Sequence, residues 1–141
     1  MVPEIRFATQ TDAGELAELI TGLGYPAQAD EVWARIERMP VGAYETLVAV
    51  LEGRVVGFIG LLTLPVYEHS LPIGWILALC VSPESQRQGV GRALIQAAEA
   101  HYRDKGVTDV RLHSGLQREG AHDFYEKVGF AKSGYRFKKK L

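Results

Sequence analysis

The sequence predicts an α/β fold in which one mixed sheet is flanked by helices. Strand-like runs of alternating or continuous apolar residues recur along the chain, and four intervening segments carry apolar residues at helical spacing. The 141 residues are 47% hydrophobic and 23% charged, which is ordinary for a globular protein with a buried core. Because no repeat, low-complexity stretch or linker interrupts the chain, we expect a single domain over residues 1–141.

The N-terminal half is expected to form a strand, two helices and a pair of strands. Thr11 and Asp12 provide an N-cap signal for the first helix, which ends before Gly24. Glu52-Gly53 separates two apolar runs, and a glycine there suits the tight turn of an antiparallel hairpin. The expected bounds are residues 4–8 for the first strand, 29–39 for the second helix, and 46–51 and 54–64 for the strand pair.

The C-terminal half is expected to alternate strands and helices. Residues 75–81 are almost continuously apolar, as in a central strand that is buried on both faces. A helix follows from Gly91 to Lys105, because apolar residues form one stripe along it and Gly106 is placed as a C-cap. The stripe contains Leu94, Ala97, Ala98 and His101. The remaining segments are predicted as a strand at 108–114, a helix at 119–128 and one or two strands within 130–137.

Charge and cysteine content argue against several classes of function. Sixteen basic and seventeen acidic side chains give a net charge of -1, so no global positive field points to nucleic acid. The run Lys138-Lys139-Lys140 is interpreted as a solvated tail. The longest apolar stretch, residues 55–66, is shorter than the ~18 residues of a membrane-spanning helix. One cysteine excludes an internal disulfide and the first residues lack a secretory pattern, so we expect a cytoplasmic protein.

The segment Gln86-Arg87-Gln88-Gly89-Val90-Gly91 joins the central strand to the long helix. Glycines let the main chain approach an anion closely, and a helix N-terminus adds favourable partial charge. Arg87 and Arg92 add a local charge of +2 with no acidic residue between them. The segment therefore predicts a site for a phosphate or polyphosphate group.

Two common phosphate-binding loops fit this segment poorly. A nucleoside triphosphate loop ends in Lys-Ser or Lys-Thr, and neither pair follows here. A dinucleotide loop has three glycines and an acidic residue on the next strand, whereas this loop has two glycines and the next strand reads Val110-Arg111-Leu112-His113. A turn that serves only packing is the remaining alternative for so short a glycine spacing.

These residues resemble the GNAT superfamily of N-acetyltransferases. Its signature [QR]-x-x-G-x-[GA] follows a strand, as residues 86–91 do here, and a second motif, Ala121-His122-Asp123-Phe124-Tyr125-Glu126-Lys127-Val128-Gly129-Phe130, matches the family's later helix and strand. Residues 118–141 are most similar in pattern to aminoalkylphosphonate and aminoglycoside 6'-type N-acetyltransferases. The resemblance implies a mostly antiparallel mixed sheet whose central strands splay apart.

The resemblance also implies that acetyl-coenzyme A (acetyl-CoA) is the cosubstrate and crosses the sheet where the strands splay. Its pyrophosphate would bind the amides of the glycine loop, and its pantetheine arm would pair with the backbone of the central strand. A backbone N–H of Leu79 or Cys80 would polarise the thioester carbonyl. The expected cofactor-binding residues are Leu79, Cys80, Val81, Gln86, Arg87, Gln88, Gly89, Val90, Gly91, Arg92, Ser114 and Tyr125.

Acetyl transfer requires an acid for the leaving thiolate and a way to deprotonate the amine. A lysine-like amine at pH 7 lies ~3 units below its pKa, which is a penalty of ~4 kcal/mol. Tyr125 stands at the family's general-acid position and would protonate the thiolate of coenzyme A; its other interpretation is a half-buried tyrosine that anchors a helix. Leu79 and Tyr125 are therefore the expected catalytic residues.

The general base stays open at this stage. Relatives in this subfamily often carry an acid on the central strand, but Trp75 stands in its place. Glu68, His69 and His113 are the candidates, acting directly or through water. The four histidines and one cysteine show no zinc spacing, so no metal is expected.

Several residues allow two interpretations. Cys80 as an acetylated nucleophile is weighed against a small buried hydrophobe, which its strand position favours. His122 either supports the cofactor or packs its helix. Arg118 stands where many family members have asparagine, and it either binds the cofactor or shapes the loop. Gly115 departs from the Ser-Asn pair that often ends the preceding strand, so no pantetheine contact is transferred to it.

The sequence thus predicts an N-acetyltransferase that moves acetyl from acetyl-CoA to a primary amine of a small molecule by direct attack. A homodimer is an open alternative to a monomer. One rival is a noncatalytic acyl-CoA sensor, which would keep the glycine loop but would not need Tyr125. Another is an acetyltransferase of protein N-termini or lysines, which would require an open groove beside the central strand.

Overall fold

The computed structural model describes residues 1–114 and 119–141, which form two compact units. The first unit is Met1–Arg111 and the second is Leu112–Leu141. The boundary between them falls within a short strand, β5 (Val110–Leu112). The single-domain organisation stays a prediction.

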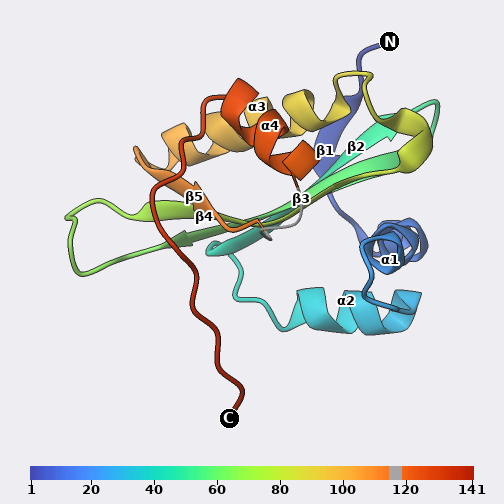
Figure 1. The fold of residues 1–141 in the computed structure, drawn as a ribbon. Helices are drawn as coiled ribbons and strands as arrows, with labels where there is room; N and C mark the ends of the chain where they lie inside the picture. The colour runs from blue at the N-terminus through green and yellow to red at the C-terminus, as the bar shows by residue number, and fades with distance from the viewer. Residues whose placement is uncertain (115–118) are drawn as a thin grey trace. The chain divides into compact units, whose positions relative to one another are not determined.

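A five-stranded sheet forms the centre of the fold, with the strand order β1-β2-β3-β4-β5 (Figure 1). The pairs β1–β2, β2–β3 and β3–β4 are all antiparallel. The bounds of these four strands are Glu4–Phe7, Tyr44–Leu51, Arg54–Leu64 and Ile73–Val81. This confirms the α/β class and the mostly antiparallel sheet predicted from the sequence. The predicted strand at 108–114 is present but shorter, as β5.

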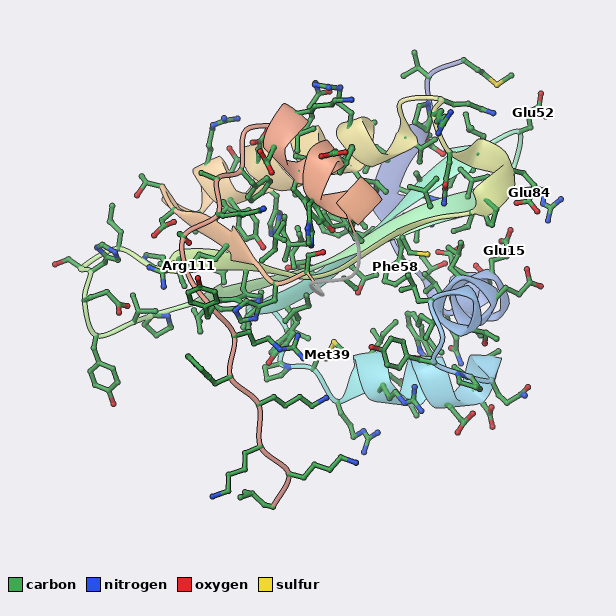
Figure 2. All side chains as sticks on the ribbon, viewed as in Figure 1. Glu15, Met39, Glu52, Phe58, Glu84 and Arg111 are labelled. Carbon is green, nitrogen blue, oxygen red and sulfur yellow. The ribbon has the colours of Figure 1, made fainter. Side chains whose placement is uncertain are left out.

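Helices cover both faces of the sheet in the first unit (Figure 1). The helices α1 (Ala13–Gly22) and α2 (Ala29–Glu37) lie on one face, and α3 (Val90–Asp104) lies on the other. Figure 2 shows Phe58 of β3 on the face that looks toward α1 and α2. The buried core on that face consists of Leu16, Ala17, Leu19, Val32, Val48, Val55, Phe58 and Cys80.

The turn before α1 is held by an ion pair instead of a side-chain helix cap. A short 3-10 helix, η1 (Gln10–Asp12), ends at Asp12, whose side chain is almost fully buried. Its carboxylate accepts hydrogen bonds from Arg6 Nη1 at 2.8 Å and from the Thr9 N–H at 2.8 Å. The hydrogen bond from the Arg6 guanidinium, together with the Thr9 contacts, holds the pKa of the Asp12 carboxyl below its usual value.

The helix α3 lies close against the sheet because two strand residues that face it are glycines. A Cβ added at Gly57 would lie 2.9 Å from the Cys80 carbonyl oxygen and 3.3 Å from side-chain atoms of Val90 and Leu94. A Cβ added at Gly74 would lie 2.7–2.8 Å from three ring atoms of Tyr102. At both ends of the helix, its side chains therefore pack directly against the backbone of a strand.

In the described part of the second unit there is one helix, α4 (Glu119–Lys127), close to the predicted span 119–128. On this helix the Tyr125 ring lies edge-on to two neighbours, at centroid distances of 5.6 Å from Phe124 and 6.0 Å from Phe130. The Phe130 N–H donates to the Tyr125 carbonyl at 2.9 Å, which closes the end of the helix.

The strands predicted within residues 130–137 are not formed, so that part of the prediction is wrong. Residues 131–141 are exposed and belong to no helix or strand. Tyr135 and Phe137 alternate with Gly134 and Arg136 as in a strand, and they are 88% and 92% exposed. Alternation is not sufficient, because a strand exists only where its backbone pairs with a neighbour. The basic side chains of the tail also favour solvent.

Candidate active site

The strand β4 contains a β-bulge at Leu77. Gly60 of β3 pairs with Ala78, whereas the next residue, Leu61, pairs with Ile76, so Leu77 is an extra residue on β4. Leu77 is 47% exposed, although Ile76 beside it is buried. A bulge bends its strand and increases the local twist. The centre of β4 is therefore the place where this strand changes direction.

Beyond the bulge, the backbone N–H groups of β4 point alternately toward β3 and away from it. The Ser82 N–H donates to the Val56 carbonyl of β3 at 2.8 Å. Because successive N–H groups in a strand point to opposite sides, the Cys80 N–H also points toward β3. The N–H groups of Leu79 and Val81 point the other way. Of the two donors that the sequence left open, Leu79 is the one on the side away from β3.

The neighbouring strand on that side is too short to pair with all of β4. The Gly74 N–H, at the start of β4, donates to the Asp109 carbonyl at 2.9 Å, just before β5 begins. The strand β5 has three residues, whereas β4 has nine. Among the described residues, β5 ends at Leu112, so it does not extend along the whole length of β4. Main-chain groups near Leu79 are placed to pair with an extended ligand.

The loop after β4 leads directly into the N-terminus of α3. After the 3-10 helix η2 (Pro83–Ser85), Arg87 has φ of 64° and Gly89 has φ of 81°. Gly89 is the N-cap of α3 in the left-handed conformation, which glycine adopts at little cost, whereas Arg87 is strained there. Such strain is found at functional sites more often than elsewhere.

The amides at the start of α3 are available to an anion. The first hydrogen bond of the helix runs from the Ala93 N–H to the Gly89 carbonyl at 3.0 Å, so the amides of Val90, Gly91 and Arg92 precede the helical ladder. A Cβ added at Gly89 would meet nothing within 4 Å, which shows that its surface is uncovered by described residues. The helix dipole makes this end of α3 electropositive.

The side chains of the loop divide into two groups. The Gln86 Nε2 donates to the Val81 carbonyl at 3.3 Å, and the Gln88 Nε2 donates to the Glu84 carbonyl at 3.2 Å. These two glutamines therefore stabilise the loop itself. The two arginines predicted to contact an anion, Arg87 and Arg92, are exposed.

The thiol of Cys80 lies within the protein, on the opposite side of the sheet from α3. Cys80 is 9% exposed, and its Sγ donates to the Leu19 carbonyl of α1 at 3.5 Å. This environment suits a small apolar side chain and a weak S–H donor more than a thiolate nucleophile.

The remaining predicted site residues lie in the second unit. Tyr125 is half-buried on α4, as described above. The Ser114 Oγ is buried and, among the described residues, has no hydrogen-bond partner. An unsatisfied buried hydroxyl requires a partner, and an incoming ligand is one source of it. Gly115 and Arg118 lie outside the described residues.

Comparison with known proteins assigns the family. Residues 14–130 match the sequence model of a family described as "Acetyltransferase (GNAT) family". The chain belongs to the GNAT acetyltransferase family. Aminoalkylphosphonate N-acetyltransferase of Salmonella typhimurium is 32% identical over 99% of this chain and 92% of its own length. Aminoglycoside N(6')-acetyltransferase type 1 of Stenotrophomonas maltophilia is 32% identical over 91% of this chain and 86% of its own.

Solved structures agree with this assignment. An acetyltransferase from Trypanosoma brucei superposes with a TM-score of 0.84 at 27% identity, and the match covers 99% of both chains. A putative acetyltransferase from Agrobacterium tumefaciens has a TM-score of 0.86 at 23% identity, covers 98% of this chain and 99% of its own, and shows the shared fold. Together with the named relatives, the family match makes this chain an N-acetyltransferase.

The candidate bases of this acetyltransferase lie in different surroundings. His69, in the loop between β3 and β4, places its Nε2 3.9 Å from Asp109 Oδ2, and Arg111 (Figure 2) donates to the same oxygen at 3.0 Å. A cavity of about 250 Å³ adjoins His69 and Asp109. Glu68 is exposed in the same loop, and His113 is exposed after β5.

The sequence patterns did not identify Tyr102 of this acetyltransferase as a residue near the candidate site. Tyr102, on α3, is 1% exposed, and its hydroxyl donates to the Trp75 carbonyl at 2.9 Å. Burial raises the pKa of Tyr102 to about 12, so the phenol stays protonated and remains a donor at neutral pH. Its position eight residues after Leu94 continues the predicted helical stripe, and that spacing is the signal by which it could have been found.

In the ranges 1–114 and 119–141, no group of three or more histidine, cysteine, aspartate or glutamate side chains is placed to hold a metal ion. Within the same ranges, every helix is too short or too polar to span a membrane.

Proposed function

We propose that this N-acetyltransferase transfers the acetyl group of acetyl-CoA to a primary amine of a small molecule by direct attack. The observation that carries the proposal is the sequence of features along one short stretch of chain. A bulged strand with backbone donors on the side away from β3 leads, within a few residues, to an uncovered helix N-terminus. Such a stretch suits a ligand with an extended amide-containing arm that ends in a pyrophosphate.

Each part of acetyl-CoA has a proposed partner in this stretch. The pyrophosphate binds the amides from Gly89 to Arg92, with the guanidinium groups of the loop arginines beside it. The pantetheine arm pairs with the backbone on the open side of β4, at Leu79 to Val81. Ser114 offers its hydroxyl as a further contact, which would satisfy its buried Oγ.

The proposed chemistry is a single displacement at the thioester. The amine nitrogen attacks the carbonyl carbon, and the Leu79 N–H stabilises the negative charge that develops on the carbonyl oxygen. The C–S bond then breaks, and the Tyr125 hydroxyl gives its proton to the coenzyme A thiolate. The proton lost by the amine passes to water or to one of the bases named above. The buried thiol of Cys80 takes no part in this scheme.

The relatives favour a small acceptor over a protein. The two named relatives that this chain spans almost completely are, by their names, acetyltransferases of aminoalkylphosphonates and of aminoglycosides. Both classes are small, polar primary amines. We therefore assign the acceptor to this general class, with acetylation of a peptide or protein as the alternative and a noncatalytic acyl-CoA sensor as the second.

A thiol-release assay with acetyl-CoA tests the proposal. The amines to be compared are an aminoalkylphosphonate, an aminoglycoside, a polyamine and a peptide with a free N-terminus. We expect turnover with at least one of the first three and none with the peptide. Turnover with the peptide alone would support the protein-modifying alternative. Binding of acetyl-CoA by calorimetry without turnover on any amine would support the sensor and contradict the enzyme mechanism.

Tyr125→Phe tests the acid in the same assay. This variant keeps the ring between its two phenylalanine neighbours and removes only the hydroxyl. Because general acid catalysis contributes about 10²–10⁴-fold, we expect turnover to fall by at least about 10²-fold, with acetyl-CoA affinity within twofold of wild type. Tyr25→Phe, at an exposed tyrosine, is the matched control. Equal turnover of the Tyr125→Phe variant and the control would remove Tyr125 from the mechanism.

A further inference from the structure

Tyr102 connects α3 to β3 and β4, the two strands between which the β4 bulge lies. Its hydroxyl donates to the Trp75 carbonyl at 2.9 Å and lies 3.4 Å from the Leu62 carbonyl. Leu62 of β3 and Trp75 of β4 are direct partners in the sheet. The phenol therefore contacts both strands at one rung of their ladder, two residues before the bulge at Leu77.

The ring of Tyr102 is held as tightly as its hydroxyl. The side chain is 1% exposed, and its ring fills the place that a Cβ on Gly74 would occupy. Because a hypothetical Cβ there would come within 2.7–2.8 Å of three ring atoms, the ring and the backbone of β4 are in direct contact. The position of the start of β4 is thus tied to the far end of α3.

The other end of α3 is tied to the far side of the same bulge. Val90 and Leu94 pack on Gly57, which pairs with Val81 at the end of β4. The helical rise from Val90 to Tyr102 is about 18 Å, and the strand from Trp75 to Val81 spans about 20 Å. The helix and the bulged strand therefore have matching lengths and are joined at both ends.

We propose that Tyr102 is a positioning residue for acetyl transfer, which fixes the N-terminal side of the β4 bulge against α3 and so keeps the Leu79 N–H aimed at the thioester. This inference rests on the proposed function. In that function the N-terminus of α3 holds the pyrophosphate, whereas the donor that acts on the carbonyl lies on β4. The relative placement of α3 and β4 then sets the distance between the anchored cosubstrate and its oxyanion donor.

If Tyr102 has this role, loss of its hydroxyl lowers turnover without weakening the binding of acetyl-CoA. Loss of the hydroxyl leaves the α3 N-terminus and its packing on Gly57, the partner of Val81 at the end of β4, in place, so acetyl-CoA keeps its pyrophosphate anchor. The strand before the bulge gains freedom, and a shift of about 1 Å far from the reacting atoms can lower a rate by about 10²-fold. We therefore expect kcat to fall by about 10- to 100-fold while the KM and dissociation constant for acetyl-CoA change by less than twofold.

Tyr102→Phe is the test, because phenylalanine keeps the ring on Gly74 and removes only the hydroxyl. Turnover is measured by thiol release with the best amine of the screen above, and acetyl-CoA binding by calorimetry. Both are measured well below the unfolding temperature of the variant, so that only folded protein is compared. Tyr25→Phe, which removes a phenol hydroxyl that is exposed, is the control and should match wild type in every readout.

A spectroscopic readout reports on the strand itself. The chain has two tryptophans, so a Trp33→Phe background leaves Trp75, whose carbonyl accepts the Tyr102 bond, as the only indole. We expect Tyr102→Phe to increase the acrylamide quenching constant of Trp75 by at least about 1.5-fold, because quenching follows exposure and local motion. A role limited to global stability would leave this constant unchanged in the folded protein.

The outcomes separate this inference from the proposed function. Wild-type turnover with an unchanged kcat in Tyr102→Phe overturns the positioning role and leaves the proposed function intact. An equal loss of kcat and of acetyl-CoA affinity also overturns it, because the residue would then act through cofactor binding. Wild-type protein that binds acetyl-CoA and acetylates no amine contradicts the proposed function and this role together. A lower kcat with unchanged affinity and greater Trp75 quenching supports the role.

Discussion

The two faces of the sheet are attached to their helices by different interactions. On the α3 face the helix packs closely on the sheet, because Gly57 and Gly74 let the helix side chains reach the strand backbone. On the α1 and α2 face, the three atoms nearest to a Cβ added at Gly60 belong to the neighbouring strand and lie at 3.8–3.9 Å, which is ordinary contact. The α3 face is therefore the more closely packed of the two at these glycines, and we call it the closed face.

Polar contacts also hold the α1 side, as the Tyr102 hydroxyl does on the α3 side. The Arg6–Asp12 ion pair fastens the turn before α1 to β1, and Glu15 Oε2 of α1 accepts the Val55 N–H of β3 at 2.9 Å. Packing contacts resist small changes in volume, whereas exposed or half-exposed polar contacts respond to pH and to salt. We therefore expect the α3 side to respond mainly to changes in side-chain volume, and the α1 side to respond also to pH and salt.

Gly74→Ala gives the largest expected effect and tests the closed face. The added methyl group would lie 2.7–2.8 Å from three atoms of a buried ring, so the ring or the strand must move. Overpacking of this kind costs typically 1–3 kcal/mol, and we expect the upper end, about 3 kcal/mol of the free energy of unfolding, because Tyr102 is 1% exposed. Urea unfolding followed by circular dichroism measures it.

Gly60→Ala is the matched control for this substitution, since it makes the same chemical change in a strand interior on the other face. Its Cβ would make only ordinary contacts, so the expected change is within about 0.5 kcal/mol. If the two variants lose the same stability, the two faces are packed alike and the comparison above is wrong.

Glu15→Gln is expected to have an intermediate effect and tests the polar attachment of α1. The amide keeps the length of the side chain and an acceptor oxygen for the Val55 N–H, but it removes the charge. Hydrogen bonds to charged groups contribute about 1.5–3 kcal/mol and neutral ones about 1 kcal/mol, so we expect a loss of about 1 kcal/mol. Chemical denaturation at low and high salt measures it. A loss that does not shrink at high salt would argue against an electrostatic origin.

The sequence was sufficient to predict most of the helices and strands and the position of the glycine loop, because both depend on local patterns. Helical spacing, the run at residues 75–81 and the spacing of Gly89 and Gly91 each act within a few residues. The final strands failed for the opposite reason. Alternation in residues 130–137 describes a strand only if a partner backbone is present, and no local pattern supplies that partner.

Within the candidate site, the sequence predicted the main-chain positions that belong to a motif or lie close to one. Leu79 and the loop residues follow from the motif, whereas the bulge at Leu77 depends on how β3 and β4 pair. The contact between Gly74 and Tyr102 joins residues 28 positions apart in the printed numbering, and nothing in either local sequence shows it. Long-range pairing decides such contacts, so single-sequence patterns do not reveal them.

Acid titration gives the smallest expected effect and distinguishes the two faces directly. The Arg6 hydrogen bond lowers the pKa of Asp12 in the folded protein, so the carboxylate stabilises the fold above its unfolded pKa, near 3.8. That contribution is lost as the pH falls from about 5 through 3.8 toward the lowered folded pKa. We expect amide hydrogen exchange in β1 and α1 to accelerate over this window before exchange in α3 does. Asp12→Asn should abolish the difference in pH response between α1 and α3. Acceleration that begins in α3 would show that packing, and not the ion pair, limits the stability of the α1 side.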